Sequence, residues 1–150
     1  MDFFECAVGD GDGVVRFEED AFAAGSHVSS SGAVEVQVRP LDSILSELEP
    51  DSVSLIKIDV EGYEYEVLNG SATTLNKYKP KVVMEFNSYA ISMHTNRSPR
   101  LLAELVLDIS GSFVVDSEHG YVVHNTETLK HFIYQNMASG CVNDIIWTPR

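Results

Sequence analysis

The chain has 150 residues, a composition that is 44% hydrophobic and 22% charged, and a formal net charge of −13. This length fits one domain, residues 1–150, and the negative charge argues against broad binding to nucleic-acid phosphates or to anionic membrane surfaces. Because no apolar run reaches the roughly 20 residues of a membrane span and the start lacks a secretory leader pattern, we expect a cytoplasmic protein that acts on small or neutral molecules.

The first quarter of the chain predicts short strands joined by turns. A strand is expected from Phe3 to Val8, and the turn-forming residues Gly9 to Gly13 end it. The alternating apolar residues of Val14 to Phe17 and of Val34 to Val38 predict the two strands of a hairpin. Between them, Ala23 to Gly32 is rich in Ser, Gly and Ala, which indicates a mobile loop.

The next segment predicts a helix, a strand and a second helical region. Apolar residues recur with the i, i+3, i+4, i+7 spacing of an amphipathic helix at Leu41, Ile44, Leu45 and Leu48. Pro50 would end this helix, and Val53 to Ile58 then predicts a buried strand. Tyr63 to Leu75 predicts a helix that breaks at Asn69-Gly70. One face of this helix would carry Tyr65, Leu68, Ala72 and Leu75.

The second half of the chain continues this alternation. Val82 to Met84 predicts a strand, and a helix is expected through Leu101, Leu102, Leu105 and Ile109. The last three strands are expected at Phe113 to Val115, Tyr121 to Val123 and Val142 to Trp147. Strands that alternate with helices predict an α/β fold with a largely parallel sheet.

Two of the predicted strands end in acids. Asp59 and Glu61 follow the strand that ends at Ile58, and Glu85 follows the strand that ends at Met84. Because the carboxyl ends of parallel strands meet at one edge of a sheet, we expect these three side chains to converge.

Each acid has a functional and a structural interpretation. Asp59 could polarise a substrate hydroxyl or cap the following helix, and Glu61 could act as a general base or complement the dipole of the first helical turn. Glu85 could share a substrate cleft with Asp59, or it could accept hydrogen bonds from backbone amides and so fix the adjoining loop. Asp59, Glu85 and Asn87 could also supply oxygen ligands to a divalent cation.

Several motifs resemble the FkbM family of S-adenosylmethionine-dependent methyltransferases over roughly residues 3 to 90. They are Lys57-Ile58-Asp59-Val60-Glu61-Gly62, Glu66-Val67-Leu68-Asn69-Gly70, Pro80 before the strand that ends at Glu85, Ala7-Val8-Gly9-Asp10, and Leu41-Asp42. The resemblance implies a Rossmann-like class I methyltransferase sheet, mostly parallel with an antiparallel last strand. It also implies methyl transfer from S-adenosylmethionine to a hydroxyl of a sugar, glycan or secondary metabolite.

The resemblance also implies roles for individual residues. Asp59, Glu61 and Glu85 would be catalytic, and Asp59 would also contact the cofactor near its methyl group. Ala7, Val8 and Asp10 would lie beside the adenine, although a plain hairpin turn is the alternative for these three.

The sequence departs from the family pattern at its start. It lacks the first strand with a glycine-rich turn for the methionine part of the cofactor, and the second strand whose terminal acid binds the ribose. We therefore expect the chain to be the C-terminal two-thirds of the domain, with Met1 internal to a longer protein. A partner chain in a homo-oligomer could instead fill the gap in the sheet, or the hairpin region could be rearranged. A catalytically inactive remnant that binds a partner is the competing hypothesis.

Overall fold

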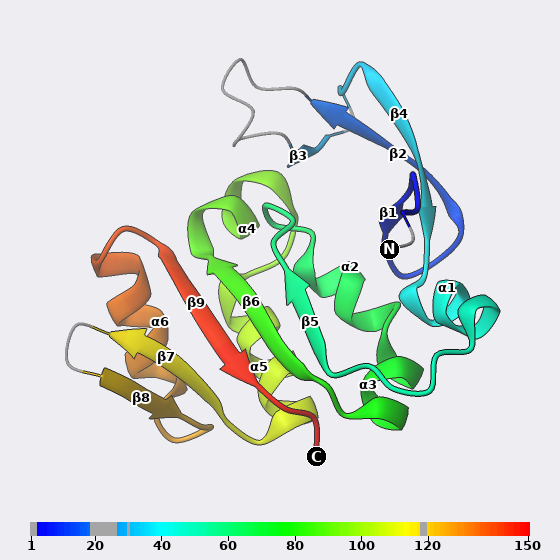
Figure 1. The fold of residues 1–150 in the computed structure, drawn as a ribbon. Helices are drawn as coiled ribbons and strands as arrows, with labels where there is room; N and C mark the ends of the chain where they lie inside the picture. The colour runs from blue at the N-terminus through cyan, green and yellow to red at the C-terminus, as the bar shows by residue number, and fades with distance from the viewer. Residues whose placement is uncertain (1–2, 19–26, 30, 118–119) are drawn as a thin grey trace.

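The computed structural model describes residues 3–18, 27–29, 31–117 and 120–150 (Figure 1). These residues form two separate sheets and six helices. The first sheet contains β1 (Ala7–Val8), β2 (Gly13–Glu18), β3 (His27–Val28) and β4 (Val34–Arg39), in the order β1-β4-β2-β3. The second contains β5 (Leu55–Ile58), β6 (Lys81–Asn87), β7 (Phe113–Ser117), β8 (Gly120–His124) and β9 (Val142–Trp147), in the order β5-β6-β9-β7-β8.

The first sheet confirms the predicted hairpin strands. β2 and β4 pair antiparallel, with Val15 opposite Val36, and β1 pairs parallel to β4. The expected first strand is shorter than predicted, because only Ala7–Val8 of residues 3–8 pairs. Part of the expected mobile loop, positions 23–26 and 30, lies outside the described residues, and within that loop His27–Val28 forms β3.

The second sheet is mixed. β5 and β6 are parallel, whereas the pairings of β6 with β9, β9 with β7, and β7 with β8 are antiparallel. The prediction of a mostly parallel, Rossmann-like sheet is therefore not confirmed, because only β5 and β6 pair parallel, whereas the last strand is antiparallel as expected. The reason is that β8 returns along β7 as a hairpin, and β9 enters in reverse between β6 and β7.

The helices leave one face of the second sheet open. They are α1 (Leu41–Leu48), α2 (Glu64–Asn69), α3 (Ala72–Tyr78), α4 (Ser88–His94), α5 (Pro99–Ser110) and α6 (Leu129–Ala138). Figure 1 shows α5 and α6 behind this sheet. The covered face holds core residues such as Met84, Phe86 and Ile145. On the open face of β5, Lys57 is exposed and Leu55 is 59% exposed, so the prediction of a buried strand is wrong. Among the described residues, no helix has both the length and the apolar character to cross a membrane.

The helical region breaks where the sequence predicts, and the break holds the two sheets together. α2 ends at Asn69, and a Cβ atom at Gly70 would overlap the carbonyl oxygen of Gly9, just after β1. The backbone N–H of Asp42 donates to Gly70 O at 3.0 Å. The Asp42 carboxylate accepts from the N–H groups of Thr73 and Thr74, in the first turn of α3, at 2.8 and 2.7 Å. α1 and β1 are thereby fixed to the corner between α2 and α3.

Candidate active site

The three predicted acids converge at the carboxyl ends of β5 and β6. Asp59, Glu61 and Glu85 each offer a carboxylate oxygen, and these oxygens all lie within 4.8 Å of one another. The parallel pairing of β5 with β6 brings the three side chains to the same sheet edge. Asp59 is exposed, whereas Glu61 and Glu85 are half-buried. We call these three residues the acid cluster.

A tight loop aims Glu61 into the acid cluster. Glu61 has φ of 49° and Gly62 has φ of 105°, so two successive residues adopt left-handed conformations. A Cβ atom at Gly62 would lie 3.0 Å from Ala90 O, which explains why the loop requires glycine there. α2 begins only at Glu64, so the alternative that placed Glu61 in the first helical turn is wrong.

The structure adds a fourth acid, Glu64, that the sequence reasoning missed. Its side chain is fully buried, and Gly62 N donates to its Oε1 at 3.1 Å. Burial raises the pKa of Glu64 from 4.5 to about 6, with backbone hydrogen bonds opposing the shift and Glu85 adding to it. Glu64 therefore braces the loop from inside the protein. The signal for its burial is its i, i+3, i+4 spacing with Val67 and Leu68.

Asn87 bridges Glu61, Glu85 and α4. Its Oδ1 accepts from Ala90 N at 3.0 Å and so caps α4. Its Nδ2 faces Glu61 Oε2 at 3.3 Å and Glu85 Oε1 at 3.4 Å. Asn87 therefore points a donor at the acid cluster, which corrects the predicted cation ligand set of Asp59, Glu85 and Asn87. Asp59, Glu61 and Glu85 are the oxygen set that the geometry offers to a divalent cation.

Glu85 has a shifted pKa within this environment. Burial is the main cause that raises it, the charges of Asp59 and Glu61 add to the shift, and the hydrogen bond from Asn87 opposes it. The described partner of Glu85 is a side-chain amide, so the alternative in which it binds backbone amides is not the arrangement seen.

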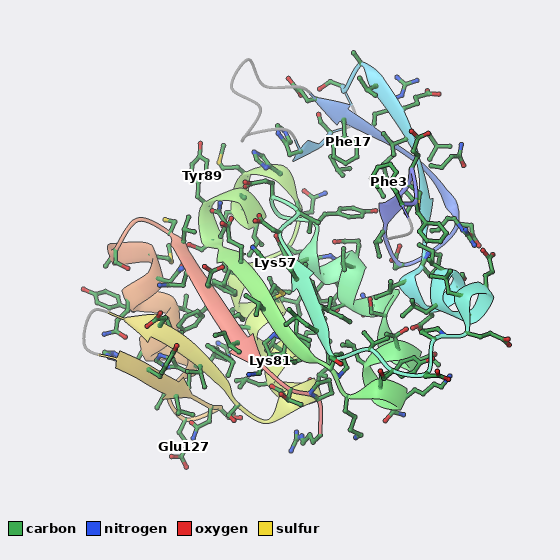
Figure 2. The ribbon with its side chains drawn as sticks, viewed as in Figure 1. Phe3, Phe17, Lys57, Lys81, Tyr89 and Glu127 are labelled. Atoms are coloured by element: carbon green, nitrogen blue, oxygen red, sulfur yellow. The ribbon has the colours of Figure 1, made fainter. Side chains whose placement is uncertain are left out.

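Lys57 brings a cation to the rim of the acid cluster, and Figure 2 shows it near the end of β5. Its Nζ lies 2.9 Å from Asp59 Oδ2, and both side chains are about half exposed. The hydrogen bond to Asp59 is the main cause that raises the pKa of Lys57. Asp59 does not cap α2, because Tyr63 is the N-cap residue and no side chain bonds to that end.

The first sheet reaches the other side of the same loop. His94 Nδ1 lies 3.2 Å from Glu61 O, and the His94 ring stacks on the ring of His27 in β3 with 3.6 Å between centroids. Arg97 pairs with Glu66 at 2.8 Å beside them. A cavity of about 130 Å³ lies here, lined by Val28, Glu61, Gly62, Tyr63, Glu66, His94 and Thr95.

Of the predicted cofactor residues, Asp59 belongs to the acid cluster, whereas Ala7, Val8 and Asp10 lie outside it, near Tyr63 of this loop. Ala7 and Val8 form β1, and a Cβ atom on the next residue, Gly9, would lie 3.2 Å from the Tyr63 ring. Burial raises the pKa of Tyr63, and Glu66 and Asp10 add to the shift. The cavity beside them is smaller than the roughly 300 Å³ from which ligand pockets range upward. This cavity alone is thus too small for a whole S-adenosylmethionine molecule.

Comparison with known proteins gives one match. Residues 4–123 match a family model described as the methyltransferase FkbM domain. No curated protein and no solved structure matches the chain. The matched range contains all three members of the acid cluster, together with Glu64 and Asn87.

Proposed function

Because this chain belongs to the FkbM methyltransferase family, we propose that it transfers a methyl group from S-adenosylmethionine to a hydroxyl oxygen held at the acid cluster. The observation that carries this proposal is the convergence of Asp59, Glu61 and Glu85, whose oxygens lie within 4.8 Å of one another. Carboxylates in this arrangement can accept hydrogen bonds from neighbouring hydroxyls of one acceptor and fix its orientation.

Glu85 is the general base in this proposal. A base that works near neutral pH benefits from a pKa above the ordinary glutamate value, and burial with two neighbouring acids gives Glu85 that shift. Asn87 holds Glu61 and Glu85 in place through its side-chain amide. S-adenosylmethionine supplies an electrophilic methyl group when bound, and the protein residues orient and deprotonate the hydroxyl that receives it.

The charge around the site favours a neutral acceptor. Asp144 lies directly opposite Glu85 in the pairing of β6 with β9, so a further acid borders the acid cluster on the open sheet face. Phosphorylated or carboxylated acceptors would be repelled, whereas the hydroxyls of a sugar, a glycan or a secondary metabolite can donate to these carboxylates.

Cofactor binding is the weakest part of the site in these 150 residues. We assign Ala7, Val8 and Asp10 to the adenine side, but the small cavity beside Tyr63 and the lack of a glycine-rich turn before a helix lead us to expect weak binding. The acid cluster is also the candidate site for a divalent cation, which transfer assays with magnesium or with a chelator will test.

The proposal is tested by methyl transfer from labelled S-adenosylmethionine to a panel of neutral saccharides. We expect Asp59→Asn to abolish transfer while its circular dichroism spectrum stays unchanged. Asp108→Asn, an exposed change on α5, is the matched control and should retain activity. Unchanged turnover in Asp59→Asn would remove Asp59 from the mechanism.

A second candidate function is a binding module without catalysis. The open face of the second sheet and the small cavity favour it, because both leave the described site incomplete for a cofactor. Calorimetric titration with S-adenosylmethionine is read together with the transfer assay, because weak binding is also expected of the methyltransferase and only the methyltransferase transfers a methyl group. Micromolar binding would argue against the binding module, whereas no binding and no transfer would favour it.

A further inference from the structure

The cavity beside the Glu61 loop has a buried carboxylate oxygen without a partner in its lining. Glu66 lines this cavity, and its side chain is only 14% exposed. Its Oε1 accepts from Arg97 Nε at 2.8 Å, whereas its Oε2 is buried and has no hydrogen-bond partner among the described residues. A buried polar atom without a partner costs free energy, so its presence calls for a bound water or a ligand.

Further contacts fix the orientation of Arg97. Its guanidinium lies over the Tyr65 ring, 3.9 Å from the centroid, and its backbone N–H donates to Thr95 Oγ1 at 3.1 Å. The cation–π contact and the ion pair with Glu66 together favour the orientation seen. Because this orientation directs Nε to Oε1 of Glu66, Arg97 leaves Oε2 for another donor.

Two neighbouring polar groups of the lining already have partners. The Thr95 hydroxyl donates to Ile91 O at 2.7 Å, and His94 Nδ1 lies 3.2 Å from Glu61 O. A ligand that used these groups would have to replace a hydrogen bond that the fold has made. Glu66 Oε2 gives up no described hydrogen bond when a ligand binds, so it is the acceptor best suited to hold one.

The size and charge of the cavity favour a neutral compound with hydroxyl groups. Its volume of about 130 Å³ corresponds to about four water molecules of about 30 Å³ each, which is room for one sugar ring. Because Arg97 already neutralises Glu66, a second cation gains little there. A hydroxyl, in contrast, donates to a carboxylate in a charge-assisted hydrogen bond. Tyr63 also lines the cavity and offers an aromatic surface to the C–H groups of a sugar ring.

We propose that this cavity binds one sugar ring of a ligand, with a ring hydroxyl that donates to Glu66 Oε2. Glu61 lines the cavity and also belongs to the acid cluster, so the proposed sugar site adjoins the proposed site of methyl transfer. Two ligands of that reaction carry such a ring, namely S-adenosylmethionine in its ribose and a saccharide acceptor. The link to methyl transfer rests on the proposed function, whereas the binding of the ring does not.

Titration of the 150-residue chain, followed by the NMR shifts of its backbone amides, tests the proposal. The probes are adenosine for the ribose and methyl β-xylopyranoside for a saccharide acceptor. Each is compared with a counterpart that lacks the ring hydroxyls, 2′,3′-dideoxyadenosine and tetrahydropyran. We expect at least one probe to bind with a Kd on the order of 1 mM, to shift the amides of Gly62 and Thr95, and to bind at least about tenfold more tightly than its counterpart. The probe that binds identifies the source of the ring.

Glu66→Gln tests the acceptor itself. Glutamine keeps an oxygen for Arg97 but replaces Oε2 with an amide nitrogen, so the charge-assisted hydrogen bond is lost and the Kd should rise about tenfold. Glu104→Gln is the matched control, because Glu104 accepts from Arg100 Nε at 2.7 Å in an exposed pair. It should leave the Kd unchanged, and circular dichroism should show that both variants are folded.

The proposal is overturned if neither probe binds at concentrations up to about 50 mM. Equal binding of a probe and its hydroxyl-free counterpart would also reject it, and this comparison needs no variant protein. An unchanged Kd in folded Glu66→Gln would exclude Oε2 as the acceptor. Probe binding in a chain that transfers no methyl group would support the sugar site and count against the proposed function alone, so the two failures can be told apart.

Discussion

The side-chain amide of Asn87 lies 3.3 Å from the Glu61 carboxylate while its oxygen caps α4 through Ala90 N at 3.0 Å. One side chain thus links the start of a helix to the acid cluster. The cap needs an oxygen at this position, whereas the acid cluster needs a donor. The two requirements can be separated by substitution.

Asn87→Asp should retain the cap but reduce methyl transfer, because aspartate is also a good N-cap residue and places a further negative charge beside Glu61 and Glu85. Asn87→Ala should lose both the cap and the amide donor to the acid cluster, and its free energy of unfolding should fall by about 1 kcal/mol. Urea unfolding and turnover, measured on both variants, check this. Equal stability losses in the two variants would mean that the oxygen does not act as a cap.

Glu64→Gln should change how stability depends on pH. A carboxyl whose pKa rises from 4.5 to about 6 on folding stabilises the protein fully below pH 4.5 and loses that contribution as the pH rises through 6. Relative to Glu64→Gln, the wild type should therefore lose about 2 kcal/mol between about pH 4 and 7. Unfolding in urea at several pH values measures this dependence. A stability difference between the wild type and Glu64→Gln that stays constant with pH would show that the pKa of Glu64 is not shifted on folding.

Asp42→Asn should show the opposite dependence on pH. Burial raises the pKa of Asp42, but its hydrogen bonds from Thr74 and Thr73 outweigh burial and hold it below the ordinary value of 3.8. Its stabilising contribution is present above that value and is lost as the pH falls. The variant should be less stable by about 1 kcal/mol at pH 7 and approach the wild type near pH 3. Asp51→Asn, on an exposed site, is the control.

Gly70→Ala should loosen the attachment of β1. Gly70 has φ of −73°, which alanine adopts freely, so the cost arises from overlap with Gly9 O alone. We expect a loss of more than about 2 kcal/mol in the free energy of unfolding. Gly11→Ala is the matched control, because no atom lies within 4 Å of a Cβ atom there, and its effect should stay within about 0.5 kcal/mol. Similar stability of Gly70→Ala and Gly11→Ala would contradict the close approach of Gly70 to Gly9 O.

Glu85 should set the acidic limb of the pH profile. As a general base it must be ionised, so kcat/KM should rise with pH, with a midpoint above the ordinary glutamate pKa of 4.5. Glu85→Gln should remove this limb and lower turnover by about 100-fold or more. The acidic limb must persist in Glu64→Gln. Its loss in that variant would show that the limb reflects the ionisation of buried Glu64 rather than that of Glu85.

The sequence predicts the acid cluster better than it predicts the sheet. Asp59, Glu61 and Glu85 follow strands whose parallel pairing is a local property of a strand-helix-strand unit, so their convergence could be inferred. The antiparallel direction of β9 is expected only from the family resemblance, because it depends on where the chain inserts between β6 and β7 rather than on the residues of β9. The β7–β8 hairpin is a local element, and the sequence predicts its two strands, at Phe113 to Val115 and Tyr121 to Val123, but not their pairing.

The helix pattern shows where periodicity misleads. Leu68 and Leu75 are buried as expected, but Ala72 is exposed and Glu64 is buried. An acid in the first turn of a helix usually lies in solvent and complements the dipole, so residue type argued against the position that Glu64 occupies. The bracing of the loop by Glu64 becomes apparent only when the loop and the start of α2 are seen together.

The left-handed backbone at Glu61 has a consequence for ligand binding. A non-glycine residue keeps such a conformation only where its surroundings hold it, and here His94 Nδ1 lies 3.2 Å from Glu61 O while the next backbone N–H, of Gly62, donates to Glu64 Oε1. The Asn87 amide, 3.3 Å from Glu61 Oε2, also restricts the direction of the Glu61 carboxylate. An arriving acceptor meets a group that has little conformational entropy left to lose, so the loss of loop mobility that often weakens binding is small at this position.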